Sequence, residues 1–327
     1  MEGDPQSKSR KPRLSPEDNL AASAIAALAY GADTLERECA AAVAGEIEPI
    51  HQLRVASRRL RAAIEMFSGV LHAGQVALLR RDLPWLAQTG GKVRECDVIG
   101  DTIRARAPKL EPRLAAMLPP LYSELDVSRR LALAELGNVL VSPRYAATIA
   151  RLRKPRVKVG ATATLLGPAS AAILARMTSA MSRAGAPLSA TSMPDAVHRM
   201  RVRVKRTRYT LEMLSALGGK RHRKALIRLE ELQDLLGSFN DTIVAIAWLI
   251  AYARAEGAPV NAVLAAGAMA ESLRRRERKL ERRCVKAWSK FERSEIMKDA
   301  IDEARRRGHW AHHDKPNLAK TSTESAK

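Results

Sequence analysis

Aromatic residues are scarce in this chain of 327 residues, of which Phe, Trp and Tyr together make up only 4%. Sheet proteins are enriched in aromatic and β-branched residues. Here alanine and leucine dominate instead, and both are strong helix formers. The scarcity of aromatics also disfavours a protein that stacks nucleic-acid bases on its side chains. The composition predicts an all-α protein.

Cysteine and long apolar runs are scarce as well. Cys39, Cys96 and Cys284 stand alone, without the paired spacing of a zinc site. An odd, scattered set of thiols argues against a disulfide framework and is typical of a reducing compartment. The apolar segment from Leu20 to Tyr30 is too short to span a bilayer, and the first residues lack the apolar core of a signal peptide. We expect a soluble, cytoplasmic protein without a bound metal.

The common catalytic signatures are missing. Gly218-Gly219-Lys220 lacks the rest of a GxxxxGK[ST] phosphate-binding loop. Neither an HExxH zinc motif nor a GxSxG nucleophile elbow occurs. Glu46-Ile-Glu48 begins like an ExExK triphosphate signature, but the lysine is absent. We expect a binding protein rather than an enzyme, with no cofactor.

Acidic residues are too few to balance the basic ones. There are 35 Asp and Glu against 56 Lys and Arg, which gives a formal net charge of +21. Such a surplus favours polyanionic partners, namely nucleic acid, phosphate polymers or an anionic membrane surface. Charge alone does not choose among these partners.

One stretch of the chain occurs twice. IHQLRVASRRLRAAIEMFSGVL (residues 50–71) returns 147 positions later as VHRMRVRVKRTRYTLEMLSALG (residues 197–218), and 8 of the 22 aligned residues are identical. A repeat at fixed spacing indicates a duplicated structural unit. The identical pairs are His51/His198, Arg54/Arg201, Val55/Val202, Arg59/Arg206, Arg61/Arg208, Glu65/Glu212, Met66/Met213 and Ser68/Ser215.

Each copy has an apolar side and a cationic side when it is placed on an α-helix, at about 100° per residue. Residues 197–206 also alternate with a period of two, which alone would favour a strand. The first copy does not alternate, so we predict helices for both. The apolar residues are Leu53, Ala56, Leu60, Ile64 and Phe67 in the first copy and Met200, Thr207, Leu211 and Leu214 in the second.

The two cationic sides form the predicted binding site. If they face each other, their charges repel unless a polyanion lies between them, and the arginine fork suits phosphate oxygens. The predicted ligands are His51, Arg54, Arg58 and Arg61 in one copy and His198, Arg201, Lys205 and Arg208 in the other. A second tier comprises Arg59, Arg81, Arg206, Lys220, Lys224 and Arg228.

Three further side-chain roles follow from the same helices. Glu65 and Glu212 are expected to orient neighbouring arginines rather than to act as acids or bases. The two histidines either bind phosphate, protonate as the pH falls or cap the helix start. The basic run LRRRERKLERR (residues 273–283) lies on a helix with an apolar side, and we expect it to be a solvated outer face.

A weaker echo accompanies the repeat. Gly91, Arg94 and Glu95 match Gly237, Asn240 and Asp241 at a spacing of 146. We interpret both glycine positions as breaks, with helices ending near residues 88 and 236 and new ones beginning near residues 92 and 238. Two similar helical bundles related by a pseudo-twofold axis are the expected architecture. The expected boundaries are a disordered basic N-terminus (1–14), a first bundle beginning at Ser15 (15–157), a second bundle (158–307) and a flexible tail (308–327), with a linker over residues 154–168.

These motifs resemble the conserved histidine α-helical domain family, CHAD. The resemblance rests on IHQLRVASRRLR, VHRMRVRVKRTRY, GKVRECDV and LQDLLGSFND and covers about residues 17–307. It implies two four-helix-type bundles about a pseudo-twofold axis, a basic central cavity that binds inorganic polyphosphate, and association with polyphosphate granules. One departure is that the family's Arg-Asp-x-Asp-Val appears here as Arg94-Glu95-Cys96-Asp97-Val98, with a longer acidic side chain at Glu95.

Two other functions remain as alternatives to polyphosphate binding. Nucleic-acid binding suits the charge, but the sequence has no groove-reading motif. Enzymatic turnover of phosphate polymers would need acidic metal ligands, and no motif supplies them.

Overall fold

A computed structural model describes residues 14–189 and 194–313 of the chain. Within these ranges the regular elements are all helices, joined by short 3-10 segments, and the all-α prediction is confirmed. The α-helices in chain order are α1 (Leu20–Arg37), α2 (Cys39–Val43), α3 (Ile47–Phe67), α4 (Ala73–Arg106), α5 (Pro112–Ala115), α6 (Pro119–Leu140), α7 (Pro143–Arg153), α8 (Leu166–Gly185), α9 (Pro194–Met213), α10 (Lys220–Ala253), α11 (Val260–Arg293) and α12 (Ile296–His313).

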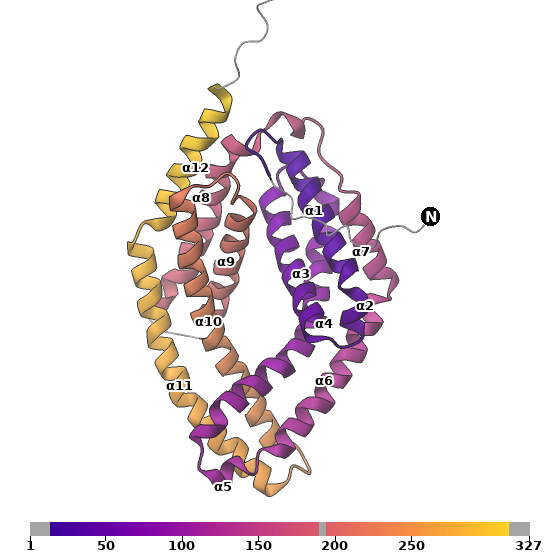
Figure 1. Ribbon diagram of the computed structural model, residues 1–327, viewed down its shortest axis with the longest axis vertical. Coiled ribbons are helices and arrows are strands. Elements are labelled where there is room, and N and C mark those ends of the chain that lie inside the picture. Colours follow the sequence, from indigo (N-terminus) through magenta and orange to yellow (C-terminus); the bar gives the residue numbers. More distant parts are fainter. Residues whose placement is uncertain (1–13, 190–193, 314–327) are drawn as a thin grey trace, which may run out of the picture.

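The broad end of the molecule contains two groups of helices side by side (Figure 1). Helices α1, α3, α4 and α7 form one group, and α8, α9, α10 and α12 form the other. The repeated helices α3 and α9 pack against each other where the groups meet. One hydrophobic core runs through both groups. This packing places the two cationic helices next to one another.

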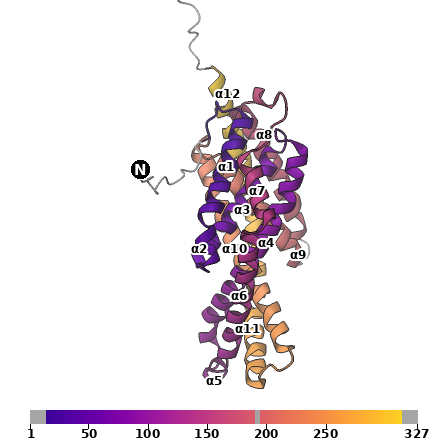
Figure 2. The same cartoon turned by 90° about the vertical axis from the view of Figure 1, so that its right-hand side faces the viewer.

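The narrow end is a third group of helices that the sequence did not predict. The C-terminal halves of α4 and α10 meet the N-terminal halves of α6 and α11 around a separate core, which contains Ile99, Leu121, Leu249 and Met269. Figure 2 shows this end projecting from the broader part of the molecule. The halves of the chain therefore join in two places, at α3 with α9 and again at this end.

The predicted helix breaks at the glycines are wrong. Helix α4 runs unbroken through Gly90 and Gly91, and α10 runs unbroken through Gly237. A glycine inside a helix costs only about 1 kcal/mol relative to alanine. Packing along both ends of such long helices outweighs that cost.

Other boundaries also differ from the predictions. Helix α1 begins at Leu20, not at Ser15, because the Asn19 side chain accepts a hydrogen bond from the backbone N–H of Ala22 at 2.7 Å. At the other end α12 continues to His313, so the tail does not begin at residue 308. The predicted disorder of residues 1–13 and the tail over 314–327 lie outside the described residues.

The predicted linker lacks α-helix until α8 begins, yet it is attached to the first half of the chain. Isolated β-bridges join Leu71 to Val157 and Asn19 to Leu165. The backbone N–H of His72 donates to the Arg156 carbonyl at 2.8 Å. This connection fixes where α8 starts relative to α1 and α3.

Helix α10 is long and apolar enough to cross a membrane, judged by length and composition alone. It packs against α4, α9, α11 and α12, as the central helix of a bundle does.

Candidate functional site: a cationic cavity between α3 and α9

The apolar sides of α3 and α9 are buried, as their periodicity predicts. Each of the nine predicted core residues, from Leu53 to Phe67 and from Met200 to Leu214, is at most 4% exposed. The helical interpretation of residues 197–206 is therefore confirmed over the strand alternative. Burial of these sides leaves the cationic sides to face the space where the two groups of helices meet.

Cations from both helices line one cavity of about 530 Å³. Helix α3 contributes two arginines and α9 contributes three cations and a histidine. Part of α4 and the ring of Tyr209 complete the walls. The lining residues are Arg58, Arg61, Pro84, Ala87, Gln88, His198, Arg201, Val202, Lys205, Arg206 and Tyr209. The two rows thus converge, which is the geometry that the duplicated pattern predicts.

Most of the converging cations have no acidic partner. Among the described residues, Arg58, Arg61, Arg201 and Lys205 form no ion pair, although each is partly buried. The Nε atom of Arg201 is buried without a hydrogen-bond partner in this part of the chain. Buried charge of one sign is costly unless it is compensated. The cavity therefore favours an anion.

The pKa values of these groups reflect both their burial and their mutual repulsion. Burial, followed by the charges of Arg201 and Arg58, lowers the pKa of Lys205 to about 6. Burial and the neighbouring Arg58 and Arg94 lower the pKa of Arg54 to about 10. The pKa values of Arg61 and Arg201 are lowered too, again mainly by burial. An anion in the cavity would raise these pKa values and favour the charged form, most of all for Lys205.

Arg54 lies behind the cavity lining, where α3 crosses α4. Its Nη1 atom donates to the Gly90 carbonyl at 3.2 Å. A Cβ atom on Gly91 would lie 3.2 Å from the same nitrogen. The absence of a side chain at Gly91 therefore allows the guanidinium to lie against α4. This glycine permits close packing and is not the helix break that the sequence suggested.

The two histidines differ in their environments. Burial lowers the pKa of His51, which lies near the charges of Glu48 and Arg94. His198 is exposed, and its Nδ1 atom lies 3.5 Å from Oδ1 of Asn240. Arg94 and Asn240 are matched positions of the weaker echo. The echo thus places Arg94 of α4 near His51 and Asn240 of α10 beside His198.

The acidic members of the echo lie near matched cations. The charge of Glu95 raises the pKa of Arg54, and the charge of Asp241 raises the pKa values of Arg201 and Lys205, in each case against the larger lowering by burial. Neither acid was predicted to belong to the site, although their matched spacing was a signal.

Ion pairs join α3 and α9 reciprocally. Arg59 Nη2 lies 3.4 Å from Glu212 Oε2, and Arg206 Nη1 lies 2.6 Å from Glu65 Oε2. Glu65 also binds Arg203 at 3.3 Å. Arg59 matches Arg206 in the repeat, and Glu65 matches Glu212. Twofold symmetry produces such reciprocal contacts. The two glutamates orient arginines as expected, and the pairs support the pseudo-twofold arrangement, which stays a prediction.

Arg208 departs from its match, Arg61. It forms ion pairs with Glu212 and Glu230 and donates through Nε to Gln233 Oε1 at 2.8 Å. Its guanidinium lies 4.8 Å from the centroid of the Tyr209 ring. The structure therefore places Arg208 outside the cavity lining, held by carboxylates.

The second-tier residues are scattered. Arg206 lines the cavity, but Arg81 binds the buried Asp82 at 2.9 Å and Arg228 binds Glu231 at 2.8 Å. Lys220 and Lys224 are exposed in the first turns of α10 and are not part of the lining. Of the second-tier residues, only Arg206 belongs to the lining of this cavity, so charge and sequence proximity were poor guides to the others.

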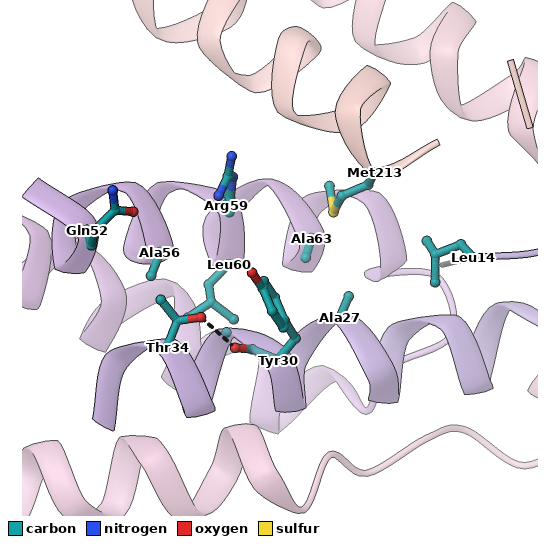
Figure 3. A pocket seen from close by; sticks show the side chains of 11 residues that line it. Leu14, Ala27, Tyr30, Thr34, Gln52, Ala56, Arg59, Leu60, Ala63 and Met213 are labelled. Carbon is teal, nitrogen blue, oxygen red and sulfur yellow. Dashed lines mark hydrogen bonds between the residues drawn. The ribbon is translucent and has the colours of Figure 1, made fainter. Parts of the chain in front are cut away.

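Arg59, also in the second tier, lies beside a different pocket. Figure 3 shows this pocket between α1 and α3, with Met213 approaching from α9. It measures about 50 Å³, and its walls include Tyr30 and Leu60. Thr34 donates to the Tyr30 carbonyl at 2.9 Å within it. The pocket is small and mostly apolar, so it does not suit a polyanion.

Among the described residues, no group of three or more His, Cys, Asp and Glu side chains could hold a metal ion.

Fold and site together define a basic all-α protein in which duplicated helices enclose a cationic cavity. The sequence profile of the CHAD domain matches residues 26–250, which is more than half of the chain. The chain therefore belongs to the CHAD domain family.

Two solved structures are similar to this chain. PptA from Streptomyces chartreusis is 17% identical with a TM-score of 0.67, and the match covers 83% of this chain and 99% of that chain. The CHAD domain from the plant Ricinus communis is 22% identical with a TM-score of 0.63, covering 94% and 97%. At these identities the likeness shows the fold alone. The comparison with curated proteins gives no match.

Proposed function

We propose that this protein binds inorganic polyphosphate, without cleaving it, in the cavity between α3 and α9. The observation that carries the proposal is the convergence of Arg58, Arg61, Arg201 and Lys205 on one cavity, where none of them forms an ion pair with a described residue. The resemblance to CHAD proteins implies the same ligand. Association with polyphosphate granules in the cytoplasm is part of this proposal.

A linear phosphate chain suits the cavity better than a nucleic acid does. Cations three or four residues apart on a helix are about 5–6 Å apart, so each row can contact successive phosphates. Single-stranded nucleic acid would need aromatic platforms for its bases. Tyr209 is the aromatic residue of the lining, and the Arg208 guanidinium already covers its ring.

The first test removes one buried arginine from each row. Arg54→Glu with Arg201→Glu should weaken long-chain polyphosphate binding at least ten-fold, equivalent to about 1.4 kcal/mol, because two attractive charges become repulsive. Binding is measured by isothermal titration calorimetry at about 150 mM salt, where distant charges are screened.

Arg274→Glu with Arg282→Glu is the matched control. Both residues are exposed on α11 and outside the cavity lining, and the change in net charge is the same. Circular dichroism verifies that each variant folds. Equal loss in the control would show that the charge effect is diffuse and would contradict the proposal.

Two further assays separate the alternatives. Single- and double-stranded DNA should fail to displace polyphosphate at equal phosphate concentration; displacement would favour nucleic-acid binding. Incubation with Mg²⁺ and long chains, followed by gel sizing, should show no protein-dependent shortening. Shortening would indicate an enzyme.

A further inference from the structure

A second basic cavity lies where the end of α4 meets α11. It measures about 430 Å³ and is lined by five cations and one leucine: Arg106, Arg275, Arg276, Lys279, Leu280 and Arg283. Figure 1 shows the end of α4 approaching α11 towards the narrow end of the molecule. The basic run on α11, expected to be only a solvated outer face, therefore has one side that lines a cavity.

Arg106 is held in position by an uncharged partner. Its Nε atom donates to Ser272 Oγ at 2.8 Å, and its Nη2 atom donates to the Ser272 carbonyl at 3.1 Å. These bonds fix the side chain but leave its charge uncompensated. A guanidinium that is oriented in advance loses little entropy when it binds an anion.

The other cations of this cavity are also poorly compensated. Arg275 pairs with Glu271 at 3.3 Å. Arg276, Lys279 and Arg283 form no ion pair among the described residues. No carboxylate belongs to the lining, so the cavity presents charge of one sign.

This cavity is separate from the central one. Gln88 lines the central cavity and Arg106 lines the second. The 18 residues from one to the other make five helical turns, so both lie on the same side of α4, about 27 Å apart along its axis. Ile99 and Ile103 lie between them and are buried in the core of the narrow end.

We infer that the cavity formed by Arg106 and α11 is a second phosphate site, which binds a further stretch of the polyphosphate chain held between α3 and α9. The inference rests on the proposed function. A short chain occupies only one of the two cavities at a time, whereas a long chain can occupy both. The second contact is then intramolecular, and the overall affinity for long chains increases.

The test compares tripolyphosphate with long-chain polyphosphate on immobilised protein. Arg276→Glu with Lys279→Glu should weaken long-chain binding at least ten-fold, because the second site is lost. Tripolyphosphate should keep its affinity for the central cavity and lose only its binding at the second cavity. Both residues are at the surface, and thermal unfolding verifies that the variant folds.

Arg274→Glu with Arg282→Glu removes the same charge from the same helix, outside the cavity, and should leave both affinities unchanged. The inference is overturned if the two α11 variants lose long-chain affinity equally, or if the cavity variant loses none. If the proposed function is wrong, the result is different. Either the wild type binds neither tripolyphosphate nor long chains, or Arg54→Glu with Arg201→Glu binds both with the affinity of the wild type.

Discussion

Lys205 shows at the scale of one residue what the cavity is suited to bind. Its surroundings are Arg201 on its own helix, Arg54 and Arg58 on α3, and Asp241 on α10. Burial and these arginines lower its pKa to about 6, so the lysine is mostly uncharged at pH 7 in the empty cavity. A phosphate chain beside it favours the ammonium form.

Polyphosphate binding should therefore take up a proton between about pH 7 and pH 8. Calorimetry in buffers of different ionisation enthalpy measures this uptake, and affinity should fall as the pH rises above about 6. Lys205→Arg should keep binding and lose the uptake, because arginine stays charged. If the variant still takes up the proton, Lys205 is not its source, and another group, such as His51, takes it up.

The same lysine affects the stability of the empty protein. The unfolded chain binds its proton up to about pH 10.5, whereas the folded chain releases it near pH 6. The unfolded state thus binds more protons across this window, and the free energy of unfolding rises with pH. In Lys205→Met this contribution to the pH dependence should disappear from urea unfolding curves; an unchanged pH dependence would contradict the lowered pKa.

At the scale of the element, the reciprocal ion pairs hold α3 against α9. The Glu65 and Arg206 side chains are 26% and 27% exposed, so their attraction is only partly screened. Glu65→Gln with Glu212→Gln should lower the free energy of unfolding by about 1 kcal/mol. The loss should shrink at high salt. Equal stability of variant and wild type at low salt would show that the pairs do not hold the helices together.

The matched glycines of α4 and α10 should respond oppositely to alanine. A Cβ on Gly237 would meet nothing within 4 Å, so Gly237→Ala should raise the free energy of unfolding by about 0.5–1 kcal/mol without changing binding. Gly91→Ala places its Cβ 3.2 Å from Arg54 Nη1, so the guanidinium must move and polyphosphate affinity should fall. Calorimetry that finds unchanged affinity in Gly91→Ala would contradict this role for the glycine.

At the scale of the whole molecule, the sequence predicted the sides of the helices but not all of their neighbours. Helical periodicity determines that Leu60 and Arg58 lie on different sides of α3, and the structure agrees. It does not determine that Arg208 binds Glu212 and Gln233 while its match, Arg61, lines the cavity. The separate core of the narrow end was missed because interior glycines resemble breaks, although packing at both ends of a long helix outweighs their small cost.

A crystal structure of the protein with a short polyphosphate bound would show directly whether the ligand occupies the cavity between α3 and α9. We predict phosphates in this cavity, with oxygens within hydrogen-bond distance of Arg58 on one side and Arg201 or Lys205 on the other. Phosphates bound only on the outer surface, with this cavity free of them, would contradict it.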